Sequence, residues 1–77
     1  MKYYLVAVFD RRVSAFMTPV AVVSLPQAQR SFLKETEGTG EFAALKADVS
    51  LHVLAEVDEE TGGVDTTCRR ELVPVTV

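Results

Sequence analysis

The chain has 77 residues, with eight Lys+Arg against eleven Asp+Glu and a net charge of −3. This length predicts a single domain, residues 1–77, with one small core. Cys68 is the only cysteine and His52 the only histidine, which excludes an intrachain disulfide and a Cys/His zinc cage. The acidic balance argues against a duplex-DNA binder, but single-strand binding needs only a local basic groove with stacking aromatics.

The amino-terminal apolar run breaks at Asp10 and alternates as a strand does. It therefore predicts neither a signal peptide nor a membrane span. A single thiol is typical of a reducing cytoplasm. Because so short a chain buries little surface, we expect self-association, most simply as a homodimer.

Residues 2–9 and 14–23 are rich in β-branched and aromatic side chains and predict two strands joined by a loop at 10–13. In both strands, the side chains on each of the two alternating faces are apolar, so each strand needs to be covered on both faces. Pro19 interrupts the second strand and predicts an edge position or a bulge, because proline cannot donate to the ladder.

Ser24 followed three residues later by Gln27 is typical of a helix start. The expected helix carries one apolar stripe, formed by Leu25, Ala28, Phe32 and Leu33, and ends at Gly38 and Gly40. Residues 41–47 could add one or two helical turns.

Residues 49–57 alternate cleanly and predict a third strand, followed by an acidic turn at 58–63. A fourth strand begins at Val64 and ends in residues 72–77, where Pro74 again indicates an edge position. We therefore predict an α+β fold, a four-stranded antiparallel sheet in the order 2-1-3-4 with one helix on one face. A second copy of the chain is the expected cover for the other face.

Four motifs follow in order: VFD, AFMTPV, AQRSF and DVSLHVLAEVDEETG. Their order and spacing resemble the small nonstructural protein of gokushoviruses, the tailless single-stranded-DNA phages of the Microviridae, over roughly residues 6–64. In the last of these motifs, which covers the predicted third strand, aromatic residues of that family are replaced here by Val49, His52 and Val57. The resemblance implies a nonstructural phage protein in the host cytoplasm, absent from the mature virion. It also implies a role in genome replication, at the switch to single-strand synthesis, or in packaging.

The candidate nucleic-acid contacts are Arg11 and Arg12 at the first hairpin tip, then Arg69, Arg70, Lys2 and Tyr4. Arginine pairs with phosphates and stacks on bases, and strand aromatics can stack bases. Phe9 and Phe16 are alternative stackers, with core or dimer interface as the competing interpretation. Arginines at the tip could instead pair with Asp10 and a neighbouring acid, and Arg69 and Arg70 could protect a sheet edge.

No nucleophile motif, phosphate-binding glycine loop or Cys–His pair is present, so we expect no enzyme activity, no metal and no cofactor. The acidic segment 58–65 lacks the ligand spacing of a calcium loop. Two hypotheses remain. The first is a dimeric module that binds single-stranded DNA, whose four arginine contacts predict a log–log salt slope of about −3. The second is a protein–protein adaptor for the replication initiator or procapsid that does not bind DNA.

Overall fold

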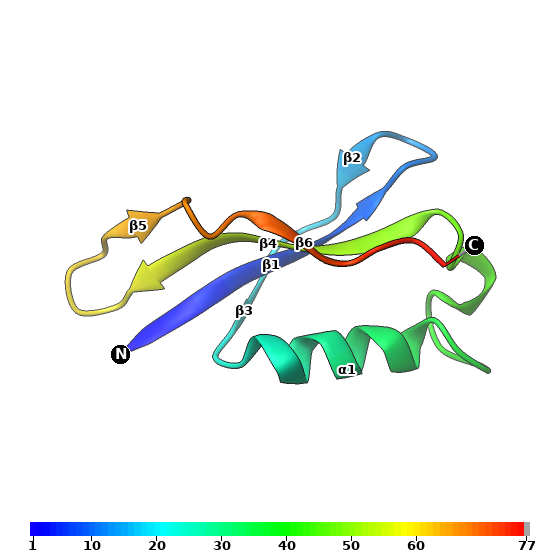
Figure 1. Cartoon of the computed structure of the whole chain (residues 1–77), viewed down its shortest axis with the longest axis horizontal. Helices are drawn as coiled ribbons and strands as arrows, with labels where there is room; N and C mark the ends of the chain where they lie inside the picture. The colour runs from blue at the N-terminus through cyan, green and yellow to red at the C-terminus, as the bar shows by residue number, and fades with distance from the viewer. Residues whose placement is uncertain (77) are drawn as a thin grey trace.

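The computed structural model describes residues 1–76 and contains an antiparallel sheet with one α-helix on one face (Figure 1). The elements are β1 (Lys2–Asp10), β2 (Ala15–Phe16), β3 (Val20–Val22), α1 (Leu25–Glu35), a 3₁₀ turn (Ala43–Leu45), β4 (Val49–Asp58), β5 (Val64–Asp65) and β6 (Arg70–Val73). The predicted α+β class is confirmed. The sheet, however, has six strands and not four.

The two long strands β1 and β4 pair along their whole lengths at the centre of the sheet. Each predicted outer strand is divided in two: β2 and β3 both pair with β1, while β5 and β6 both pair with β4. The outer strands therefore flank β1 and β4 as the order 2-1-3-4 predicts. The predicted number of strands was wrong because two short segments, residues 17–19 and 66–69, interrupt the outer strands.

Local chemistry explains both interruptions. Pro19 lies between β2 and β3, and it has no N–H with which to continue the ladder. Between β5 and β6, the Asp65 carboxylate accepts hydrogen bonds from the backbone N–H of Thr67 (2.8 Å) and from its hydroxyl (2.7 Å). These bonds close a tight turn, and they lower the pKa of Asp65, with the backbone donor as the main cause.

Helix α1 begins where the sequence predicts. The Ser24 hydroxyl accepts a hydrogen bond from the backbone N–H of Gln27 at 3.3 Å. Phe32 points into the core and is buried. Leu33 was expected in the same stripe but is 42% exposed, so that assignment was wrong. The helix ends at Glu35, before the predicted Gly38, and Thr36 caps it by donating its backbone N–H to the Leu33 oxygen at 3.1 Å.

The main core lies between α1 and the sheet and is built from Val6, Phe32, Val49, Leu51, Val53 and Val73. An irregularity between β1 and β4 shifts their register by one residue, because Leu5 pairs with Ala55 whereas Val6 pairs with Val53. Leu54 is thus the extra residue of a β-bulge, which adds local bend and twist. Figure 1 shows β2 and β5 lifted away from the side that carries α1.

Candidate nucleic-acid interface

A row of three rings and one guanidinium crosses the sheet face that α1 does not cover. The Phe9 and Phe16 ring centroids are 4.9 Å apart, and the His52 ring lies 5.3 Å from Phe16 and 6.0 Å from Phe9, all edge-on. The Arg69 guanidinium lies over the Phe16 ring, 5.4 Å from its centroid. Phe16, Phe9 and His52 lie on the neighbouring strands β2, β1 and β4, so strand pairing brings the rings together, and Arg69 joins them from just before β6.

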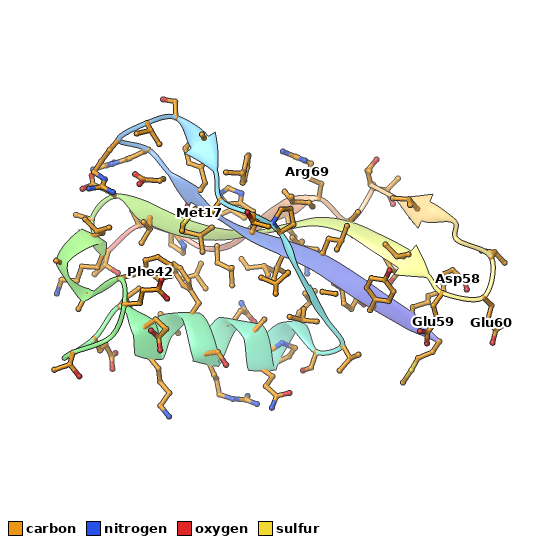
Figure 2. The ribbon with its side chains drawn as sticks, turned by 180° about the vertical axis from the view of Figure 1, so that it is seen from behind. Met17, Phe42, Asp58, Glu59, Glu60 and Arg69 are labelled. Atoms are coloured by element: carbon orange, nitrogen blue, oxygen red, sulfur yellow. The ribbon has the colours of Figure 1, made fainter. Side chains whose placement is uncertain are left out.

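This ring row covers much of the second face from within the chain. Beneath it, Ala7 on β1 is 1% exposed and Ser50 on β4 is 3% exposed. The contact between Arg69 and Phe16 joins the β6 side of the sheet to the β2 side. In Figure 2, Arg69 lies on the opposite side of the sheet from α1. The apolar second face therefore does not by itself require a second copy.

Arg69 and Arg70 flank the start of β6 and differ from the other arginine pair in their electrostatics. Among residues 1–76, no carboxylate forms an ion pair with either guanidinium. The Arg70 side chain donates to the backbone oxygen of Cys68 at 3.1 Å. It also lines an open groove of about 540 Å³ together with Tyr4 and residues 23–26 at the start of α1. The structure thus brings Arg70 and Tyr4 to one groove, whereas Arg69 lies over Phe16 on the face that α1 does not cover.

Arg11 and Arg12 lie at the exposed tip of the β1–β2 hairpin, but local carboxylates neutralise both. Arg12 binds Asp10 through two nitrogens, at 2.7 and 3.1 Å. Arg11 pairs with Asp48 at 3.3 Å. The Arg12 hydrogen bond is the main cause that lowers the pKa of Asp10 below its ordinary value. The pairing interpretation of this tip therefore matches the geometry, with Asp48 as the neighbouring acid.

Lys2 lies at the opposite end of β1 from the hairpin-tip arginines. It begins β1, whereas Asp10 ends that strand, so roughly 26 Å of extended backbone separates Lys2 from the hairpin tip. Its ammonium pairs with Glu56 at 3.6 Å on the neighbouring strand. The acidic turn at 58–60 occupies the same end of the molecule (Figure 2). Lys2 thus belongs to an end with net negative charge.

A comparison with known protein families matches residues 3–75, almost the whole chain, to the family described as Phage ORF5 protein. The chain belongs to the Phage ORF5 protein family. It is thus a phage protein, as the resemblance implied at this coarser level. A search of curated proteins finds no match, and a search of solved structures finds none either.

His52 of this Phage ORF5 family member has partners that sequence reasoning did not foresee. Its Nε2 lies 2.9 Å from the Ser50 hydroxyl and 3.9 Å from a Glu71 carboxylate oxygen. A serine–histidine–acid relay needs the serine and the acid on opposite ring nitrogens and an exposed hydroxyl. Here both groups face the same nitrogen and Ser50 is buried. The trio therefore orients the imidazole within the ring row and does not form a relay.

Residues 1–76 contain no group of three or more His, Cys, Asp or Glu side chains arranged to hold a metal ion. In the acidic turn, Asp58 accepts hydrogen bonds from the backbone N–H groups of Glu60 and Gly62, which is the pattern of a hairpin turn. None of the helices within the described residues has the length and apolar character to cross a membrane.

Proposed function

We propose that this phage protein binds single-stranded DNA on the side of the molecule where Arg69 lies over Phe16. The proposal rests on the Arg69 guanidinium. Its central carbon lies 5.4 Å from the centroid of the Phe16 ring, and it has no carboxylate partner among residues 1–76. We further propose that the protein is the small nonstructural protein of a gokushovirus. On this proposal it acts in host cytoplasm, in the switch to single-strand synthesis or in packaging, and is absent from the virion.

The chemistry of single strands supports this choice of surface. An unstacked base presents a flat π face, and proteins bind it on aromatic rings or on the plane of an arginine. Phe16 is 38% exposed and holds the Arg69 guanidinium on its ring, so a base can stack on the outer guanidinium plane or on exposed ring surface. The guanidinium N–H groups point outward within the plane of the group, where phosphate oxygens can accept hydrogen bonds from them.

A second contact lies across the β6 edge. Arg70 follows Arg69 directly and is the first residue of β6. Arg70 opens onto the groove that it shares with Tyr4, and this groove begins at the first turn of α1. A single strand that crosses this edge would meet two uncompensated arginines and a second aromatic ring.

The adaptor function remains the alternative, and one observation favours it. The protein has a net charge of −3, and because both tip arginines are paired with carboxylates, only a small basic surface remains. An adaptor would contact the replication initiator or procapsid through protein surfaces and would leave oligonucleotides unbound.

Fluorescence anisotropy with a labelled oligothymidine at low salt tests the proposal. We expect binding by the wild-type protein and a weaker signal with a duplex of equal length. Arg69→Gln should lower affinity about 5- to 100-fold, because it removes both a phosphate contact and a stacking plane. Phe16→Leu should lower affinity in the same direction while it keeps an apolar side chain in the row.

Arg30→Gln is the matched control, since Arg30 is an exposed arginine on α1 outside the ring row. It should leave affinity within about twofold, because one solvated charge adds little at a distance. Absence of oligothymidine binding at low salt would reject single-strand binding and favour the adaptor. Equal losses with Arg30→Gln and Arg69→Gln would show non-specific attraction and reject this surface.

A further inference from the structure

The outer edge of β3 is an uncharged sheet edge beside an apolar groove. Residues 13–29, which include β2, β3 and the start of α1, contain no charged side chain. Val20 is 60% exposed and Val23 is 67% exposed. Edge strands of monomeric proteins are commonly protected by a charge, a bulge or a covering segment. Pro19 blocks pairing just before β3 and β3 is short, but β3 itself carries no charged side chain.

The groove lies between β3 and α1, on the open side of the two-layer core. It has a volume of about 520 Å³, with the core residues Val6 and Leu51 among those that line it. Its other walls are β3 and the small or uncharged helix residues Gln27, Ala28 and Ser31. A second hollow of about 280 Å³ continues it past Val20 towards Phe42. Figure 2 views the molecule from this side, with β3 in front of β1 and Phe42 between sheet and helix.

The ladder determines which backbone groups face outward. Met17 donates its N–H to the Val8 oxygen at 2.8 Å, so even-numbered residues of β1 direct their polar groups towards β2 and β3. Val20 pairs with Val6 and Val22 pairs with Tyr4, which turns the polar groups of these two valines inward. By the same alternation, the N–H and C=O of Ala21 point away from β1.

We propose that this edge is the contact between two copies of the chain, with β3 pairing antiparallel to the partner's β3 about a two-fold axis at Ala21. The two Ala21 residues would exchange both N–H···O=C bonds. The partner's valines would lie over the groove and cover the exposed apolar surface on both copies.

Charge makes a second copy the best-fitting occupant. A two-fold contact places the same patch against itself, so a patch with one sign of charge would repel its partner. With a net charge of −3, two copies repel over most of their surface. The uncharged stretch 13–29 is where that repulsion is weakest, and it coincides with the unpaired polar groups of β3.

The area requirement brings α1 into the contact. A stable interface commonly removes about 800 Å² from each partner, which is about a sixth of the 4994 Å² accessible surface of this chain. The three residues of β3 are too few to supply this area. A two-fold axis perpendicular to the sheet places both α1 helices on the same side, where Gln27, Ala28 and Ser31 of each can pack against the other.

Sedimentation velocity over a series of micromolar concentrations, without nucleic acid, tests this contact separately from DNA binding. The wild-type protein should sediment as a dimer. Val20→Lys should raise the dissociation constant about 100-fold, because it places two like charges across the axis. Ala21→Pro should also give monomers, because it removes the two central donors while the β1 ladder does not use that N–H.

Val64→Lys is the matched control, because Val64 is an edge-strand valine with 62% exposure on the opposite side of the sheet. It should leave the dimer unchanged. Circular dichroism of each variant should match that of the wild-type protein, which separates loss of association from unfolding. A monomeric wild-type protein would overturn the proposal, and so would folded Val20→Lys and Ala21→Pro variants that dimerise as well as Val64→Lys.

Discussion

The ionic pairing of the hairpin tip predicts how strongly salt weakens binding of single-stranded DNA. Each arginine that neutralises a phosphate contributes about −0.7 to the slope of log affinity against log salt. Arg69 and Arg70 have no carboxylate partner among residues 1–76, whereas Arg11 and Arg12 do. Two free arginines therefore predict a slope of about −1.4, in place of the −3 or so expected from four equivalent contacts.

The physical reason is that the carboxylate and the phosphate compete for the same donors. Arg12 already holds Asp10 through two hydrogen bonds, at 2.7 and 3.1 Å. A phosphate that replaced this carboxylate would leave Asp10 as an unpaired charge beside the DNA backbone. Little net electrostatic free energy is gained by the exchange, so the tip contributes little to the salt dependence.

Anisotropy titrations at four or more salt concentrations, with the variants compared as pairs, provide the measurement. Substitution of Arg69 and Arg70 together by Gln should bring the slope close to zero. The same double substitution of Arg11 and Arg12 should leave it near −1.4, about two contacts at −0.7 each. A wild-type slope near −3 that the tip substitution halves would refute this reasoning and return the site to the hairpin.

Three further predictions concern pH and stability. The Asp10 carboxyl should titrate below its ordinary 3.8 in NMR, and Arg12→Gln should raise its pKa towards that value, because Arg12 favours the ionised form. The stabilisation from this pair is present above the ordinary pKa and is lost as pH falls through the lowered one. Val53→Ala at the fully buried centre of β4 should lower the free energy of unfolding, measured in urea, by about 2–3 kcal/mol. Val64→Ala, at an exposed site, should lower it by less than about 0.5 kcal/mol. Equal losses for the two variants would contradict the placement of the core. Gly40→Ala should lower the melting temperature, since its Cβ would overlap a helix carbonyl oxygen, and an unchanged melting temperature would contradict that close approach.

Local sequence rules predicted the parts of the fold that local chemistry controls. The Ser24 cap, the edge character around Pro19 and the pairing of β1 with β4 all depend on short-range preferences and alternation. The loop of the first hairpin was predicted at 10–13, and the strands close around residues 11–14, with Ser14 at a positive φ of 52°. That displacement by one residue reflects how weakly sequence determines the ends of elements.

The same rules could not predict which charges meet. Asp48 follows the 3₁₀ turn and lies 37 residues from Arg11 in the sequence. The two residues meet only because the pairing of β1 with β4 places Asp10 opposite Val49. Leu33 was assigned to the buried face, but the rotation of α1 on the sheet leaves it exposed. Neither outcome is visible in periodicity, because each depends on how two elements pack.

By itself, the sequence determined the local preferences of the chain: an apolar first strand at 2–9, an alternating strand at 49–57 and one helix capped by Ser24. Only the tertiary structure decided what covers each face. The curl of the sheet brings Arg69 over Phe16 and buries the second face under the chain's own rings, while the edge of β3 keeps unpaired polar groups. Strand twist and bulge geometry act over the whole sheet, so they place distant side chains together in ways that no local pattern specifies.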